Sequence, residues 1–261
     1  RNMCSVAKLY RSMRVELSEK GYIKGASISF FENLRAENPN SFAVQMYDLY
    51  RGSFSAEKMW GSIAQFVTNA LEPFFYAESR MMFSGKSTIH FADLGREKSI
   101  LFVIVSDMEK TMDSMLGIFY SQMIRTLVES ADARDNAMLE VPVRIILDDF
   151  AAGFTIPDFD EFISVIRSRG VSVSLIVQDI AQLEKMYTKA QAQTILSNCG
   201  CKVFIGGQDE RTSEYLGKMI GCLPEKFTKM NDNEAVVLIR GRDEIYTVKI
   251  EPYAMDRELG L

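Results

Sequence analysis

Two adjacent carboxylates, Asp148 and Asp149, come directly after the aliphatic run Ile145-Ile146-Leu147. Such a run is typical of a buried parallel strand that is covered on both faces, and ligands of these sheets bind beyond the carboxyl ends of the strands. Carboxylates at that edge can hold hydrated Mg²⁺ and can orient or deprotonate a water that attacks a phosphate. The pattern predicts a nucleotide and metal site, although Asp after a strand is also a common helix cap.

In P-loop ATPases this arrangement is the Walker B strand. Its first acid holds hydrated Mg²⁺, and the following acid, usually Glu, prepares the attacking water. We therefore assign the metal to Asp148 and the water to Asp149. The side chain of Asp149 is one methylene shorter than that of the usual Glu.

A second apolar run, 172–177, ends on the polar residue Gln178. Between the two runs, residues 158–167 carry apolar side chains at helical spacing, and Arg169-Gly170 provides a stop. This order predicts a strand, helix, strand unit. Its right-handed crossover places Gln178 beside the two acids, where a neutral amide could sense a γ-phosphate or position water.

Several motifs occur in an order that resembles the type IV secretion coupling proteins, the RecA-like hexameric ATPases of conjugative DNA transfer. The resemblance covers roughly residues 25 to 251. The main motifs are Ile146-Leu147-Asp148-Asp149-Phe150, Ile156-Pro157-Asp158-Phe159, Ile166-Arg167-Ser168-Arg169-Gly170, Val177-Gln178, Ile195-Leu196-Ser197-Asn198-Cys199-Gly200 and Gly206-Gly207-Gln208-Asp209. The chain departs from the family in having Asp149 where Glu is usual, and in having no phosphate-binding loop.

The resemblance implies an α/β fold, with a RecA-like, mainly parallel sheet, flanking helices and an all-α inserted domain. It implies ATP and Mg²⁺ as cofactors, and as partners single-stranded DNA with relaxase and relaxosome accessory proteins, together with secretion channel components. It further implies a homo-hexamer at the cytoplasmic face of the bacterial inner membrane. No apolar run in the sequence approaches a membrane span, so we expect a soluble, cytoplasmic segment and membrane attachment outside it.

The tetrapeptide Gly85-Lys86-Ser87-Thr88 imitates the end of a Walker A sequence, but position 80, where Walker A requires Gly, is Arg. A phosphate loop leaves a strand and opens a helix. Here a helical pattern precedes the tetrapeptide, and residues 89–92 alternate like a short strand. We predict an exposed turn. By resemblance, the true loop lies outside this sequence, so the chain is expected to be a fragment lacking Walker A and inactive in isolation.

Arg167 and Arg169 follow the helix after the acids. In ring ATPases an arginine from one subunit can neutralise charge on a phosphate held by its neighbour. A helix C-terminus also favours cations through its dipole, so a structural role explains at least one of the two. Both remain candidate trans-acting arginines.

The sequence divides near residue 85. Residues 1–85 lack strand alternation and predict an all-α domain, to which the resemblance gives recognition of substrate or relaxosome proteins. Residues 86–261 alternate between strands and helices and predict the C-terminal part of a RecA-like nucleotide-binding domain. Helix 109–128 should bury a Met-rich stripe. The expected strands are 100–106, 143–147, 172–177, 202–206, 235–240 and 245–250, the last two forming a hairpin.

Charge and composition narrow the choice of function. The chain has 261 residues, with 30 basic and 35 acidic side chains and a net charge of −5, which disfavours a surface that coats DNA by charge alone. Four cysteines without a CxxC pair and one histidine disfavour a zinc site. Three functions stay open: an ATP-driven coupling motor, which we favour, a non-catalytic module that docks substrate proteins, and a RecA-like translocase of duplex DNA.

Overall fold

In the computed structural model the chain divides into two compact units, residues 1–89 and 90–261. Each unit is treated by itself. The functional roles given above to the two parts remain predictions. The structure describes residues 3–13, 16–18, 21–23, 27–52, 57–84, 87–105, 112–150, 153–207 and 209–249.

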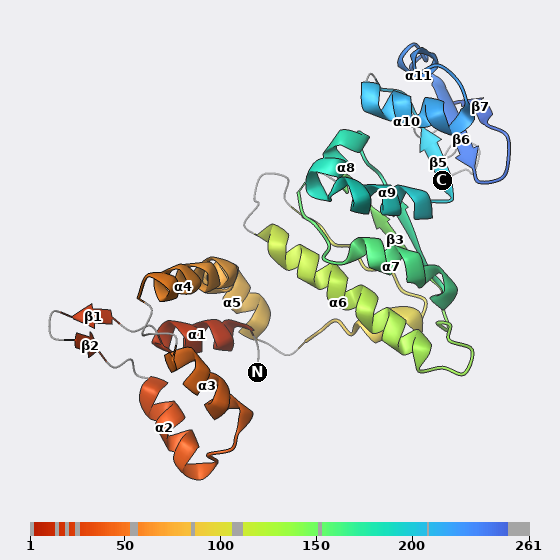
Figure 1. Cartoon of the computed structure of the whole chain (residues 1–261). Coiled ribbons are helices and arrows are strands. Elements are labelled where there is room, and N and C mark those ends of the chain that lie inside the picture. The colour runs from red at the N-terminus through yellow and green to blue at the C-terminus, as the bar shows by residue number, and fades with distance from the viewer. Residues whose placement is uncertain are drawn as a thin grey trace. The chain divides into compact units, whose positions relative to one another are not determined.

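The first unit is mainly helical (Figure 1). Pro73 lies at the start of the 3₁₀ helix η2. It ends the preceding helix α4, because proline lacks the amide hydrogen that a helix interior needs. A short antiparallel pair, β1 with β2, makes the expectation of an all-α part wrong in this detail. The elements are α1 Met3–Met13, β1 Glu16–Ser18, β2 Gly21–Ile23, α2 Ser27–Glu37, α3 Phe42–Gly52, α4 Glu57–Leu71, η2 Glu72–Phe75 and α5 Ala77–Ser84.

The second unit alternates strands and helices, as the sequence predicts. Its predicted helix 109–128 is α6, described from Asp113 and continuing to Asp132, while residues 109–111 lie outside the described part. The elements are η3 Phe91–Gly95, α6 Asp113–Asp132, β3 Val143–Leu147, α7 Phe159–Val165, η5 Ile166–Arg169, β4 Val171–Leu175, α8 Ile180–Met186, α9 Lys189–Asn198, β5 Cys201–Phe204, α10 Glu210–Ile220, α11 Glu225–Thr228, β6 Glu234–Ile239 and β7 Ile245–Val248.

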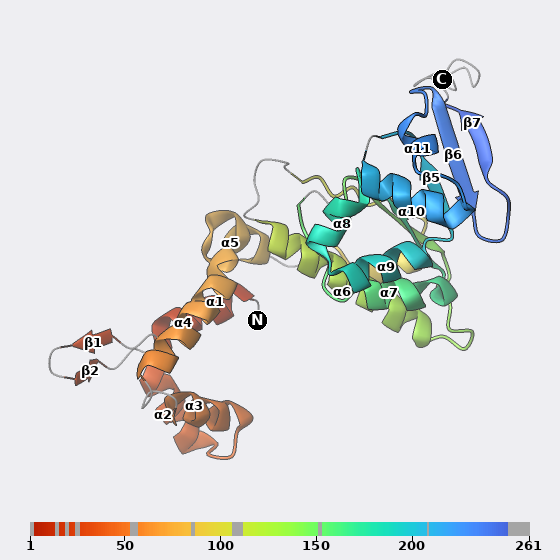
Figure 2. The same cartoon turned by 45° about the horizontal axis from the view of Figure 1, so that its top comes forward.

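The strands of this unit form two sheets rather than one mainly parallel sheet. β3 and β4 pair in parallel, with Val143 opposite Val171 and Leu147 opposite Leu175. β5, β6 and β7 pair antiparallel, and α10 and α11 lie beside them (Figure 2). The predicted hairpin is confirmed, since β6 and β7 are joined through Gly241, whose φ of +77° suits glycine.

The strand expected at 100–106 is not found. Residues 100–105 have no strand pairing, and residue 106 lies outside the described part of the chain. The side chains of Phe102 and Ile104 are 81% and 94% exposed. A β-prone run becomes a strand only when a neighbour completes its hydrogen bonds, and the described residues supply no such neighbour.

The core of the second unit lies between β3 and the helices α6, α7 and α9. The C-terminal part of the expected stripe of α6 lies in this core, with Met123, Ile124 and Leu127 buried, whereas Met115 is buried outside this cluster. β3 buries Ile145 and Leu147 on one face, whereas Ile146 on the other face is 64% exposed. The expectation that both faces of this strand are covered is therefore wrong for the described residues.

Candidate functional site

The chain turns immediately after β3, and this turn places the two acids at the carboxyl edge of the parallel pair. The Ile176 amide donates to the Leu147 carbonyl at 3.0 Å, and the Phe150 amide donates to the Ile176 carbonyl at 2.9 Å. Both bonds extend the β3–β4 ladder past its last paired residues. Asp148 and Asp149 lie between these bonds, so the backbone of β4 fixes their position.

The structure brings Asp149 and Gln178 together, as the strand order predicts. The Gln178 side-chain amide donates to Asp149 Oδ1 at 3.3 Å, and the Asp149 backbone amide donates to Asp148 Oδ1 at 3.1 Å. Gln182 of α8 donates in turn to Gln178 Oε1 at 3.0 Å. All three predicted residues, Asp148, Asp149 and Gln178, are exposed, so this polar group faces solvent at the sheet edge.

Asp149 has a left-handed backbone, with φ of +45°. A residue other than Gly adopts this conformation at a cost of order 1 kcal/mol, and Asp is among the residues that tolerate it best. The conformation directs the chain out of the strand direction in a single residue. It separates the exposed carboxylates from Phe150, which is only 1% exposed.

Tyr187 packs against the buried side of this turn. Its hydroxyl accepts a hydrogen bond from the Ile156 amide at 2.9 Å, and its ring stacks on Phe150 with centroids 5.6 Å apart. Burial raises the pKa of Tyr187 to about 12. Tyr187 thus contacts both ends of the segment that leaves the acids. The sequence did not predict this role, because no spacing indicates a contact across 31 residues.

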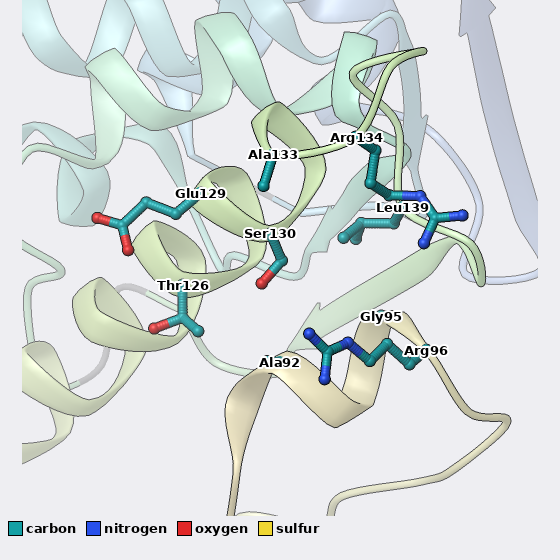
Figure 3. Close-up of a pocket in the computed structure, with 9 residues that line it drawn as sticks. All are labelled: Ala92, Gly95, Arg96, Thr126, Glu129, Ser130, Ala133, Arg134 and Leu139. Atoms are coloured by element: carbon teal, nitrogen blue, oxygen red, sulfur yellow. The ribbon is translucent and has the colours of Figure 1, made fainter.

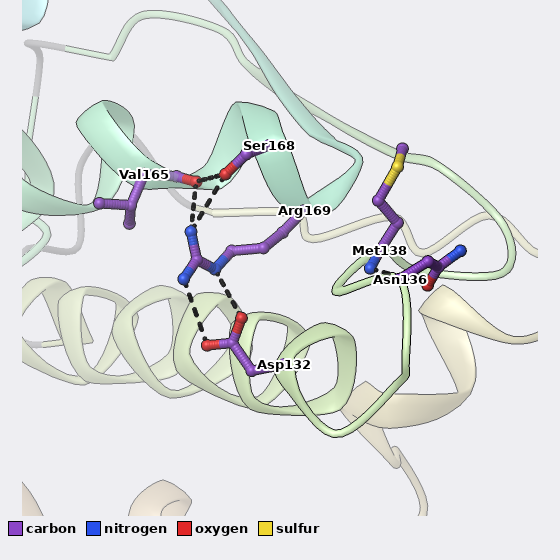
Figure 4. Close-up of polar contacts among 6 residues, drawn as sticks. All are labelled: Asp132, Asn136, Met138, Val165, Ser168 and Arg169. Carbon is purple, nitrogen blue, oxygen red and sulfur yellow. Dashed lines mark hydrogen bonds and ion pairs between the residues drawn. The ribbon is translucent and has the colours of Figure 1, made fainter.

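The two candidate arginines belong to η5, which immediately precedes β4, so they lie at the opposite, amino edge of the same strands. Figure 4 shows the side chain of Arg169 between η5 and Asp132. Arg169 donates through Nε and Nη2 to the Asp132 carboxylate at 2.9 and 3.3 Å, and through Nη1 to the Val165 carbonyl at 3.2 Å and Ser168 Oγ at 3.1 Å. The exposed Arg167 side chain has no hydrogen bond or ion pair with any described residue. Of the two guanidinium groups, that of Arg167 is therefore the one available to another molecule.

The tetrapeptide at 85–88 is only partly described, since Gly85 and Lys86 lie outside the described residues. Ser87 and Thr88 are exposed and belong to no helix or strand. The expectation of a short strand at 89–92 is wrong, because η3 begins at Phe91. The element before the tetrapeptide is α5 and the next element after it is a short 3₁₀ helix, so the context of a phosphate loop is absent among the described residues.

The acids could hold only part of a metal's coordination shell. No group of three or more His, Cys, Asp or Glu side chains that could hold a metal occurs among the described residues. Asp148 and Asp149 offer carboxylate oxygens, which suit Mg²⁺ because this ion keeps several waters and takes few protein ligands. The site therefore fits a hydrated Mg²⁺ that a bound phosphate would also help to coordinate.

The fold and this edge are those of an α/β protein with an acid pair and an amide beyond two parallel strands. Residues 142–235, which include all the predicted site residues, match the family described as the TraM recognition site of TraD and TraG. Protein VirD4 of Rhizobium radiobacter is 24% identical over 208 residues, and protein VirD4 of Agrobacterium fabrum is 24% identical over the same length. Each match covers 67% of this chain and 30% of the relative.

Solved structures of coupling proteins have a fold similar to that of this chain. The unbound bacterial conjugative coupling protein TrwBdeltaN70 matches with a TM-score of 0.64 and 17% identity, covering 85% of this chain and 55% of that chain. TrwB in complex with ADP and Mg²⁺ matches with a TM-score of 0.61 and 17% identity, covering 97% and 70%. The resemblance to type IV secretion coupling proteins is confirmed. The chain spans about 30% of the length of the curated relatives it matches.

Proposed function

We propose that this chain is part of a coupling ATPase, which recruits a relaxosome and delivers its DNA and protein to a type IV secretion channel using ATP. The observation that carries the proposal is the hydrogen bond between Gln178 and Asp149 at the carboxyl edge of parallel strands. In its support, TrwB, whose fold is similar, has been solved with ADP and Mg²⁺. The full protein would act as a homo-hexamer at the cytoplasmic face of the inner membrane.

Asp148 would hold the metal through a water. One of its carboxylate oxygens accepts the Asp149 amide, and no described residue engages the other. When bound, Mg²⁺ neutralises charge on the β- and γ-phosphates. The phosphate loop, with its Lys and its Ser or Thr, must come from sequence outside these residues, so the isolated chain should not hydrolyse ATP. Turnover by the isolated chain that disappears on Lys86→Ala would contradict this assignment.

Asp149 would orient or deprotonate the attacking water, and Gln178 would report the γ-phosphate. Gln178 donates to Asp149 Oδ1 and leaves Oδ2 free to accept a hydrogen bond from water. The amide is neutral, so it occupies one oxygen of Asp149 without adding a charge to the site. A phosphate oxygen that accepted the Gln178 amide would release Asp149 Oδ1, which couples nucleotide occupancy to the position of the carboxylate.

Arg167 is the better of the two candidate trans-acting arginines. β3 and β4 are parallel strands of five residues, so the arginines before β4 and the acids after β3 are separated by about 16 Å at about 3.3 Å per residue. Neither arginine can serve the acids of its own chain across that distance. Arg169 is already bound to Asp132, which leaves Arg167 to reach a neighbouring subunit.

Mixing subunits tests the trans assignment. In a longer form of the protein that contains the phosphate loop, hexamers of Arg167→Ala and hexamers of Asp149→Asn should each be inactive. Mixed hexamers should regain part of the ATPase activity, because some interfaces then pair an intact acid with an intact arginine. Mixing Arg169→Ala with Asp149→Asn is the matched control, and activity restored only in that mixture would reverse the assignment.

A docking module without catalysis is the second candidate. It is favoured by the matched family's description as a TraM recognition site, which covers the segment that holds the acids. DNA-stimulated ATPase activity of the longer protein distinguishes the two. We expect Asp148→Asn to lower this activity at least about 100-fold while Asp135→Asn, an exposed acid in the loop after α6, leaves it unchanged. An inactive wild type that still binds relaxosome proteins would support the docking module.

A further inference from the structure

A cavity on the second unit, drawn in Figure 3, is lined by none of the residues of the proposed nucleotide site. It has a volume of about 390 Å³ and lies between η3 and the C-terminal half of α6. We call it the Arg96 pocket. Its lining residues are Ala92, Gly95, Arg96, Thr126, Glu129, Ser130, Ala133, Arg134 and Leu139.

The floor of the pocket is held by backbone contacts. The Val141 amide donates to the Gly95 carbonyl at 3.0 Å, and the Arg96 amide donates to the Asp93 carbonyl at 3.0 Å. A side chain on Gly95 would meet Leu139, which is itself only 6% exposed, at 2.7 Å. Arg96 therefore leaves the backbone at a fixed position directly after a buried glycine.

Three polar side chains of the pocket are available to a ligand. Arg96, Thr126 and Ser130 have no side-chain hydrogen bond or ion pair with any described residue. Serine and threonine on a helix commonly bond to a carbonyl in the preceding turn, so two free hydroxyls on neighbouring turns can bond to another molecule. Figure 3 shows the guanidinium of Arg96 in the space between the two elements and the hydroxyl of Ser130 directed toward that side.

Among the described residues around the pocket, Arg96 is a cation without a matching anion. Arg134 is paired with Glu140 at 3.1 Å, and Glu129 extends away from Arg96 in Figure 3. Neither Asp93 nor Glu97, which lie near Arg96 in sequence, forms an ion pair with it. A ligand with one negative charge balances Arg96. The second negative charge of a phosphate would have no cation to balance it and would be repelled by Glu129.

We propose that the Arg96 pocket binds a carboxylate group. The planar guanidinium can donate two parallel hydrogen bonds to a carboxylate, and the hydroxyl of Ser130 can donate to one of its remaining lone pairs. The carboxylate can belong to a small organic acid or to an acidic side chain of a protein partner. Both sources share this chemistry, and the size of the pocket admits either.

The test is an NMR titration of the 261-residue chain at constant ionic strength, following the Ser130 amide and the Arg96 Nε–H. The probes are butyrate, a short capped peptide with one glutamate, and inorganic phosphate. We expect saturable shifts with butyrate or the peptide and weaker binding of phosphate. Tighter binding of the peptide would identify a protein segment as the source, and binding of butyrate alone would identify a small acid.

Two variants make the test specific. Arg96→Gln should weaken carboxylate binding about tenfold or more, as expected for loss of a charge-assisted pair of hydrogen bonds. Arg134→Gln removes the other lining arginine, which is already paired, and should change binding by less than about threefold. Absence of saturable shifts with both carboxylate probes, equal losses in the two variants, or tighter binding of phosphate would each overturn the proposal.

Discussion

The polar side chains at the two edges of the β3–β4 pair differ in how many hydrogen bonds they make. At the carboxyl edge, Asp149 and Gln178 are exposed and share one hydrogen bond of 3.3 Å. At the amino edge, Arg169 makes four hydrogen bonds to three residues, and its side chain is 27% exposed. The carboxyl edge thus keeps unused hydrogen-bonding capacity at Asp149, whereas at the amino edge Arg169 is tied to α6 and Arg167 is the arginine left without a described partner.

This difference separates groups available for chemistry from groups that serve the fold. A carboxylate that is to orient water needs a free oxygen, and Asp149 retains one. An arginine that holds a helix end needs partners for its donors, and Arg169 makes four side-chain hydrogen bonds. The support for the carboxyl edge lies beneath it instead, in Phe150 and Tyr187.

Removal of the buried anchor should have the largest effect on stability. Phe150→Ala should lower the free energy of unfolding by about 3–5 kcal/mol, because it leaves a cavity beneath the acids where the ring contacts Phe159 and Tyr187. Urea unfolding followed by circular dichroism measures this change. Ile146→Ala, at a residue that is 64% exposed, is the matched control and should change stability by about 0.5 kcal/mol or less.

Tyr187→Phe should have the next largest effect. It leaves the Ile156 amide without its partner, at a cost of about 1–2 kcal/mol near neutral pH, measured by urea unfolding. If the variant is as stable as the wild type, the hydroxyl does not hold the segment after the acids.

The contribution of Tyr187 to the free energy of unfolding should depend on pH. The pKa of Tyr187 is raised to about 12 by burial, from an ordinary value of 10.0. Above pH 10 the unfolded state loses this proton while the folded state keeps it, so this contribution to stability falls as the pH rises toward 12. Phenylalanine has no such proton. The stability difference between wild type and Tyr187→Phe should therefore narrow over this range, and a widening difference would contradict the assignment.

Substitution of either arginine at the amino edge should have the smallest effect on stability. Arg169→Ala should cost about 1 kcal/mol, because its ion pair with Asp132 is partly exposed, and the cost should shrink at high salt. Arg167→Ala should change stability by about 0.5 kcal/mol or less, since its side chain has no described partner. Unfolding at low and high salt tests both, and equal losses would remove the distinction between the two arginines.

The sequence allowed the local elements and the meeting of Asp149 with Gln178 to be predicted. Apolar runs bounded by polar or glycine residues predicted β3, β4 and the β6–β7 hairpin, and crossover handedness placed Gln178 near the acids. The β1–β2 pair was not predicted because its strands have three residues each, too few to show alternation.

Contacts between distant segments could not be predicted. Residues 100–105 have a strand-like composition, but composition does not reveal whether a neighbouring strand is present. The pair of Arg169 with Asp132 spans 37 residues and depends on where α6 ends. Tyr187 reaches Ile156 only because α8 returns the chain over Phe150, and a sequence pattern does not show such a return.

We propose that the carboxyl edge takes part in nucleotide hydrolysis, and Asp149→Asn in a longer form of the protein with a phosphate loop tests this proposal. Nucleotide binding and steady-state ATP hydrolysis should be measured on the same preparation. We predict that binding changes by less than about threefold while hydrolysis falls at least about 100-fold, because the variant removes only the group that is proposed to prepare the water. Hydrolysis at the wild-type rate would contradict the proposal.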